Sequence, residues 1–255
     1  MTFAIEFPPV SHVVEWPEIA LEGTPFAINK VVLLMWLSVI VAFGFIWLAG
    51  RDFKLVPNPL QNAAESLIEF VENGIVLETI GPKGLGYVPF LTTLFVFVFV
   101  TNIWEVIPGI QMPVNARIAL PVFLALLVWV IYMFLGMRTQ GVFGYFKNMM
   151  VPPGVPKAIL PLVAPIELVS TVIVRPLSLS VRLFANMLAG HLLLVSFAVI
   201  CASLWALSIT LAILPFAFGL LVALTGFEIL VAFLQAFIFT ILTAVYIDSS
   251  LNPAH

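Results

Sequence analysis

Charged residues are scarce in this chain of 255 residues. Asp, Glu, Lys and Arg make up only 9% of it, whereas 62% of its residues are hydrophobic. A water-soluble domain carries about 25% charged residues, so this chain lacks the polar surface that such a domain exposes. Its net charge of −3 also argues against a nucleic-acid partner, which requires a basic stripe. The single cysteine, Cys201, excludes a disulfide within the chain.

Cofactor and metal motifs are lacking as well. The chain has no phosphate-binding P-loop, no glycine-rich dinucleotide turn, no Cys and His residues at metal-binding spacing, and no nucleophile paired with a base. We therefore expect no cofactor, no metal and no ATP chemistry on this chain. The first 29 residues contain four glutamates and no Lys or Arg, the opposite of a cleaved signal peptide, so the first apolar run is predicted to act as an uncleaved signal.

Apolar runs of about 20 residues, the length that crosses roughly 30 Å of hydrocarbon, recur along the chain. They predict an all-α, polytopic membrane protein with about five transmembrane helices in a single membrane domain, 1–255. Between the first two runs, Glu65, Glu69 and Glu72 alternate with apolar residues at helical spacing, which predicts an amphipathic helix lying at the interface. The predicted segments are an external N-terminal segment 1–30, spans 31–49, 88–104, 118–137, 166–204 and 210–247, and the interfacial helix 61–80.

The last two predicted spans are unusually long. If residues 166–247 form two helices with a turn near Trp205 to Thr210, each has about 38 residues and measures roughly 57 Å. Such helices must tilt steeply in the bilayer. Pro176 and Pro215 are the predicted kinks, and four short spans are the alternative to two long ones.

Orientation follows from the Lys and Arg residues of the loops, which concentrate on the cytoplasmic side. In a five-span arrangement six cations fall on one side and two on the other, which predicts an external N-terminus and a cytoplasmic C-terminus. The larger group is Arg51, Lys54, Lys83, Arg138, Lys147 and Lys157, and the smaller is Lys30 and Arg117.

Arg182 lies deep within the fourth predicted span, about 16 residues from its start. An arginine inside the bilayer is costly and is functional by default. It keeps its proton, but it favours the ionised form of a nearby carboxylate. The alternative role is a structural ion pair with Glu228 or Glu105. Arg175, seven residues earlier, either reaches the cytoplasmic interface or takes part in ion transfer.

His191 and Glu228 form a candidate titratable pair. In an antiparallel hairpin, residues at equal distance from the turn lie at equal depth. His191 and Glu228, and likewise Arg182 and Gln235, are equally distant from a turn near residue 209, so each pair is predicted to lie at one depth. Arg182 and His191 are nine residues apart and therefore lie on opposite faces of a straight helix, so a curved helix or two separate functional surfaces would be needed. A single histidine that only bonds between helices is the alternative.

Five further polar residues qualify as site candidates, each with a structural alternative. Asn186, with the small residues after it, permits close helix packing, and Gln235 is an amide of the kind that joins membrane helices. Asn102 and Glu105 end the second span on the outer side, where they line a path for water or cap the helix. Glu167 opens the fourth span, where a carboxylate is favourable in any case.

Together these motifs resemble subunit a of F-type ATP synthase. The segment RPLSLSVRLFANMLAGH at 175–191 resembles the family's signature helix, 228–239 resembles the helix after it, and TNIWE at 101–105 resembles its end-of-span motif. The match is strong over about 175–247 and looser over 88–110. It implies a non-catalytic membrane subunit that works with a ring of c subunits, the peripheral-stalk subunit b and other ATP synthase subunits in the plasma membrane of a bacterium, with protons as the transported ion.

The resemblance also implies a role for each position. Arg182 corresponds to the family's essential arginine, which faces the c-ring, and Asn186 and Gln235 correspond to its polar neighbours. His191 and Glu228 occupy the two positions of the outer half-channel, in the order opposite to that of some bacterial members. The position of Glu105 is often acidic, whereas Glu167 is out of register with the family's cytoplasmic carboxylate. A stand-alone proton-coupled transporter would instead show repeated halves and a midplane substrate site, and neither is evident.

Overall fold

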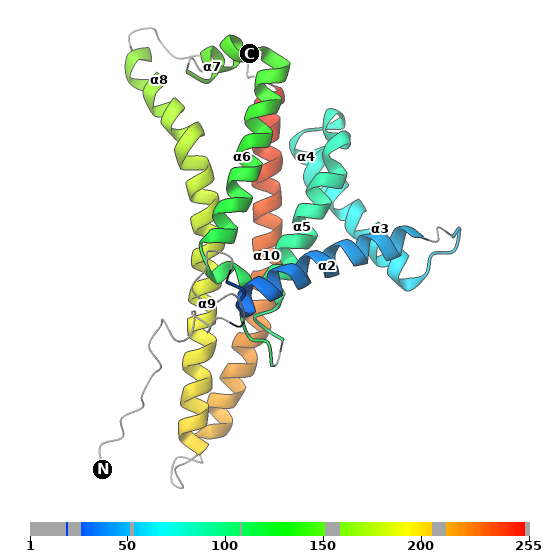
Figure 1. Ribbon diagram of the computed structural model, residues 1–255, viewed down its shortest axis with the longest axis vertical. Helices are drawn as coiled ribbons and strands as arrows, with labels where there is room; N and C mark the ends of the chain where they lie inside the picture. Colours follow the sequence, from blue (N-terminus) through cyan, green and yellow to red (C-terminus); the bar gives the residue numbers. More distant parts are fainter. Residues whose placement is uncertain are drawn as a thin grey trace.

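The computed structural model describes residues 19, 27–51, 54–107, 109–150, 159–205 and 213–252. All regular elements in these ranges are helices (Figure 1). They are α2 (Lys30–Arg51), α3 (Pro59–Val71), η1 (Glu72–Val76), α4 (Leu77–Thr79), η2 (Pro82–Tyr87), α5 (Val88–Ile103), η3 (Val114–Ala116), α6 (Ala119–Gln140), α7 (Val142–Met150), α8 (Leu160–Val169), η4 (Ser170–Val174), α9 (Arg175–Trp205) and α10 (Leu214–Leu251).

In the described part of the chain, five helices are long and apolar enough to cross a membrane, which confirms the predicted all-α, polytopic class. They are α2, the continuous run of η2 and α5, α6, the continuous run from α8 through α9, and α10. The two last have 46 and 38 residues, so the prediction of two long helices rather than four short ones is also confirmed. In Figure 1, α2 runs across the long direction of α9 and α10, so these helices cannot all stand upright in one bilayer.

The helix boundaries differ from the predicted ones near two prolines. The fourth spanning helix begins at Leu160 rather than at 166 and holds Pro165 in its interior. Pro215 lies in the first turn of α10, where its missing N–H costs nothing, so the prediction of a kink there was wrong. Most of the predicted external segment 1–30 and most of the predicted turn at 205–210 lie outside the described residues.

Pro176 follows a π-helical turn, η4, rather than an ordinary α-helical turn. In an α-helix the proline ring clashes with the carbonyl four residues earlier, here that of Val172, which lies in η4. The wider π turn relieves this contact while the helix continues. The helix that carries Arg182 is therefore continuous with α8 in spite of its proline.

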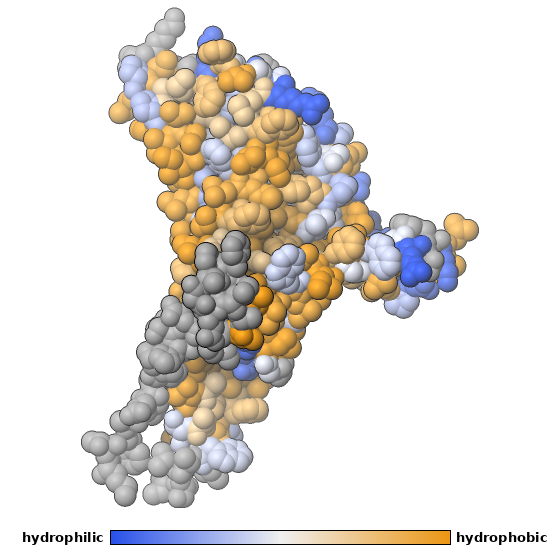
Figure 2. Space-filling view, in the orientation of Figure 1, coloured by the Kyte–Doolittle hydropathy of each residue, from blue (hydrophilic) through white to orange (hydrophobic). Residues whose placement is uncertain are grey.

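The core lies between α5, α6, α9 and α10. Phe95, Val128, Leu183 and Phe239 represent these four helices in one buried cluster. The outer surface is largely apolar in Figure 2, as expected for helices whose solvent is lipid. α3 is amphipathic: Gln61, Ala64 and Val71 face inward, and its glutamates face outward.

Candidate functional site

Arg182 projects from α9 and is half-buried. Within the described residues it forms no hydrogen bond and no ion pair, so the proposed structural pairing with Glu228 or Glu105 is not found. A permanent cation in the middle of a long apolar helix therefore lacks a counter-charge from the described part of its own chain. Such a cation is stable only where it faces water or an anion.

Asn186, one helical turn after Arg182, links α9 to α10. Its Nδ2 donates a hydrogen bond to Oε1 of Gln235 at 2.8 Å. Gln235 is buried, and its Nε2 has no partner among the described residues. This hydrogen bond thus joins α9 and α10 one helical turn from Arg182. Gln235 Nε2 remains there as a buried hydrogen-bond donor.

A second group of polar side chains is buried further along the same helices. His191 of α9 and Glu228 of α10 are each 4% exposed, and Glu105, in the segment after α5, is 3% exposed. His191 Nδ1 lies 3.9 Å from Glu105 Oε1. The structure therefore brings together the predicted pair and Glu105, three groups that can each bind and release a proton.

Gly190 explains how the Glu228 carboxylate fits between the helices. A Cβ atom built on Gly190 would stand 2.5 Å from Glu228 Oε2 and 2.7 Å from its Oε1. Since real Cβ atoms essentially never approach this closely, any other residue at this position would require the Glu228 carboxylate to move from its place. The small residue that the sequence related to helix packing instead accommodates a carboxyl group.

Asn115 completes this group, and the sequence reasoning missed it. It lies in the short 3₁₀ turn η3 and is fully buried. Its Nδ2 donates to Asn102 Oδ1 at 2.6 Å and to Thr101 Oγ1 at 2.8 Å. These bonds orient Asn102, which is also fully buried, so Asn102 is not a simple helix cap at a wet interface. We refer to Asn102, Glu105, Asn115, His191 and Glu228 as the outer cluster, a name taken from the predicted orientation, in which the end of α5 faces the outer side.

The outer cluster holds polar atoms that the described residues do not satisfy. They are Asn102 Nδ2, Asn115 Oδ1, Glu105 Oε1 and Glu228 Oε2. A buried polar atom without a partner costs about 1–3 kcal/mol, and a native protein retains such atoms mainly where they serve a function. Burial, together with the negative charge of Glu228, raises the pKa of Glu105 to about 8. Glu105 can therefore both take up and give up a proton near neutral pH.

Arg175 and Glu167 lie at the end of the α9–α10 pair that is far from Trp205 and Leu214. Arg175 Nη2 lies 3.8 Å from Glu167 Oε1, and both side chains are partly exposed. Arg175 also donates to Ser249 Oγ at 3.3 Å and stacks 5.4 Å from the centre of the Tyr246 ring. Unlike Arg182, this arginine is compensated by its own chain. In the described ranges, no three His, Cys, Asp or Glu side chains are grouped to hold a metal ion.

Comparison with known proteins gives one consistent match. A family model described as ATP synthase A chain matches residues 32–248. A protein named ATP synthase subunit a from Parafrankia is 43% identical over 243 residues, covering 93% of this chain and 80% of its own length. The subunit a of Streptomyces lividans is 42% identical, covering 89% of this chain and 81% of its own length. That of Brucella canis is 42% identical and covers 96% of both chains.

Proposed function

Because this chain belongs to the ATP synthase A chain family and is a multi-pass membrane subunit of a bacterial ATP synthase, we propose that it forms the stationary half of the proton pathway, beside a rotating ring of c subunits. The observation that carries this proposal is the uncompensated charge of Arg182, since the described part of the chain supplies no carboxylate to pair with it. A carboxylate from a neighbouring subunit would meet that need.

The proposed role of Arg182 follows from its fixed charge. A protonated carboxylic acid that approaches Arg182 is drawn toward its ionised form and releases its proton. Because the guanidinium itself does not give up a proton, it cannot pass one along and it blocks a direct leak. The Asn186–Gln235 hydrogen bond holds α10 beside this position, which supports a firmly placed charge.

The outer cluster is proposed to deliver protons from the outer side. Asn102 and Glu105 lie at the end of α5, and Glu228 and His191 lie on α10 and α9, so three helices converge on one buried group of acids and amides. The raised pKa of Glu105 suits a group that exchanges protons at neutral pH. From this cluster a proton would pass to a c-subunit carboxylate, which then enters the lipid in neutral form.

Arg175 and Glu167 are proposed to line the route on the cytoplasmic side. Arg175 lies about 10 Å and Glu167 about 22 Å along the helix from Arg182, on the side away from the outer cluster. Two routes that end on either side of Arg182 force each proton to travel with the ring. Each proton crossing then yields about 2.3 kcal/mol per 100 mV of membrane potential.

The proposed placement in the membrane has an external N-terminus and a cytoplasmic C-terminus, based on the excess of loop Lys and Arg residues on one side. The proposed partners are the c-ring along α9 and α10 and the membrane helix of subunit b on another face. The long α9 and α10 leave large apolar side chains such as Val181 and Phe227 exposed, which supports a protein or lipid neighbour along them.

The test is Arg182→Ala in inverted membrane vesicles that contain the assembled complex. We expect ATP-driven proton uptake, followed with a pH-sensitive dye, to fall by about 100-fold or more, because the charge that drives carboxylate ionisation is gone. Arg138→Ala is the matched control, since Arg138 is exposed in the last turn of α6, and it should pump normally. Normal pumping by Arg182→Ala in an assembled complex would contradict the proposed mechanism.

A further inference from the structure

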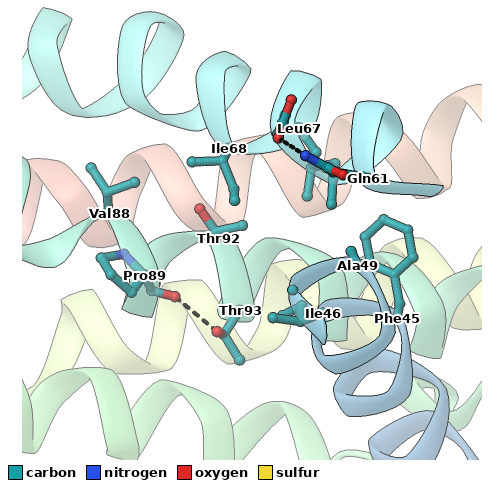
Figure 3. A pocket seen from close by; sticks show the side chains of 13 residues that line it. Phe45, Ile46, Ala49, Gln61, Leu67, Ile68, Val88, Pro89, Thr92 and Thr93 are labelled. Atoms are coloured by element: carbon teal, nitrogen blue, oxygen red, sulfur yellow. Dashed lines mark hydrogen bonds between the residues drawn. The ribbon is translucent and has the colours of Figure 1, made fainter. Parts of the chain in front are cut away.

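The side chain of Tyr132 reaches from α6 into the π turn that precedes α9. Many hydroxyl groups in the described helices donate to a carbonyl of their own helix, as Thr93 does to Pro89 at 2.8 Å (Figure 3). The hydroxyl of Tyr132 instead donates to the backbone carbonyl of Thr171, on a different helix, at 2.7 Å. Tyr132 is 1% exposed and Thr171 is 3% exposed, so water does not compete for this hydrogen bond.

The carbonyl of Thr171 needs a donor from outside its own helix. In the π turn the N–H of Arg175 donates to the carbonyl of Ser170, five residues earlier. The next bond in this register would join the N–H of residue 176 to the carbonyl of Thr171, but Pro176 has no N–H. The hydroxyl of Tyr132 replaces that missing donor. The π turn therefore depends on a side chain of α6.

The π turn also decides which ionisable residues share a helix face with Arg182. Arg175 and Arg182 are seven residues apart, two turns of a regular helix, so they lie within about 20° of each other. Glu167 and Arg175 are eight residues apart, which would separate them by about 80° on a regular α-helix. Because the π turn accommodates one extra residue, Glu167 falls on the same face, and its Oε1 lies 3.8 Å from Arg175 Nη2.

A change of register in this turn would move α8 rather than α9. Leu183 of α9 is buried in the core, and Asn186 of α9 is bound to Gln235 of α10. None of the ten residues of α8 is buried. If the turn adopted the α-helical register with its residues unchanged in number, α8 would rotate by about 100° and carry Glu167 away from Arg175.

We propose that Tyr132 is a positioning residue, which holds the π turn and thereby places Glu167 in line with Arg175 and Arg182. The inference rests on the proposed function, in which Glu167 and Arg175 line the cytoplasmic route. Without the Tyr132 hydroxyl, the buried carbonyl of Thr171 regains a donor only in the α-helical register, where the N–H of Arg175 reaches it. Loss of the hydroxyl should shift the balance between the two registers about 5- to 150-fold toward the α-helical one.

The experiment reads the alignment of the helix face by crosslinking. Glu167→Cys and Arg175→Cys are introduced together in a chain whose single cysteine is removed by Cys201→Ser. Membrane vesicles that hold the assembled complex are treated with a bifunctional methanethiosulfonate about 10 Å long, the length of two helical turns. The two cysteines should be linked in the otherwise native chain, and Tyr132→Phe should reduce the linked fraction about fivefold or more.

Two controls accompany this measurement. Tyr145→Phe removes another buried hydroxyl, which donates to Met133 Sδ rather than to the π turn, and it should leave the linked fraction unchanged. Ser178→Cys with Ala185→Cys gives a pair that is also seven residues apart but lies wholly within α9, so its linking should not depend on Tyr132. An unchanged linked fraction for the pair that spans the π turn would overturn the proposal.

Proton uptake distinguishes positioning from general damage. Glu167→Gln removes the group that Tyr132 is proposed to place. Tyr132→Phe should therefore slow ATP-driven proton uptake of the native chain, by no more than Glu167→Gln does, and should cause no further loss in the Glu167→Gln chain. Additive losses would overturn the positioning role. Normal uptake by Glu167→Gln would instead contradict the proposed cytoplasmic route, whereas the crosslinking result, which needs no activity, still decides the role of Tyr132.

Discussion

Gly190→Ala is the substitution that most directly tests the geometry of the outer cluster. The new Cβ would lie 2.5 Å from Glu228 Oε2, whereas ordinary contact begins at 3.4 Å. The carboxylate must therefore withdraw by about 0.9 Å or α9 and α10 must separate. Overpacking of this kind costs about 1–3 kcal/mol.

If that cost falls on proton transfer through Glu228, the rate of ATP-driven proton uptake should fall about 5- to 150-fold, since each 1.36 kcal/mol is a factor of ten. The assay is dye-monitored acidification of inverted vesicles, with the amount of assembled complex measured on the same preparation. Gly219→Ala is the control, because a Cβ at this position of α10 meets nothing within 4 Å.

A second variant distinguishes displacement of the carboxylate from general damage. Glu228→Asp shortens the side chain, so in the Gly190→Ala background it should restore part of the lost proton uptake by returning space to the site. Full proton uptake in Gly190→Ala alone, with normal assembly, would refute the argument that Gly190 makes room for a functional carboxylate.

Two further predictions concern the other members of the outer cluster. Asn115→Ala removes the hydrogen-bond donor to Asn102 and Thr101 and should destabilise the chain by about 1–3 kcal/mol. The measurement is the unfolding temperature of the purified complex, which should fall. Asn62→Ala, at an exposed position of α3, is the control and should leave the unfolding temperature unchanged. The pKa of Glu105 is raised to about 8 in the folded chain, above its ordinary value of 4.5, so the folded chain favours the protonated carboxyl group. The contribution of this group to the free energy of unfolding is therefore complete below pH 4.5 and is lost as the pH rises through 8. Glu105→Gln should therefore flatten the fall in unfolding temperature between about pH 5 and 9, and an unchanged slope would contradict the burial of an ionisable carboxyl group at this position.

The membrane fold could be predicted from the sequence because lipid imposes a simple requirement. Each span needs a long apolar run, and the described part of the chain has five helices with such a run. The two long helices were predictable from the near absence of charge between residues 166 and 247. The position of Pro215 was misjudged because a proline at the first turn of a helix and one in its middle give the same local signal until the helix start is known.

The depth of the site residues along α9 and α10 could be predicted from the sequence, but the side chains that face one another could not. Symmetric numbering about the turn placed Arg182 level with Gln235 and His191 level with Glu228. The structure bonds Gln235 to Asn186, one helical turn along α9 from Arg182, and sets Glu228 against Gly190, the residue before His191. Residue numbers fix how far two positions lie along a hairpin, whereas side-chain direction decides which of them meet.

Asn115 could not be found in this way, because its contacts are not periodic. It belongs to a three-residue turn and reaches back to Thr101 and Asn102 across a loop. A polar residue just before Arg117, in the loop that follows the Thr101–Asn102 pair, is the one signal that the sequence offers. Such a signal is common in loops and carries little weight without a structure.

The π turn at Ser170–Val174 makes the direction of Arg182 differ from the direction that counting residues along a regular α-helix would give. Each residue of an α-helix advances the azimuth by about 100°, and a π turn accommodates one residue more than an α-helical turn of the same rise. Deleting a single residue from this turn would therefore return it to an ordinary α-helical turn and leave the direction of Arg182, relative to α8, nearly unchanged. The same deletion in the α-helical residues between this turn and Arg182 would rotate Arg182 by about 100°. The π turn thus shifts by one position which residues of α8 share a helix face with Arg182.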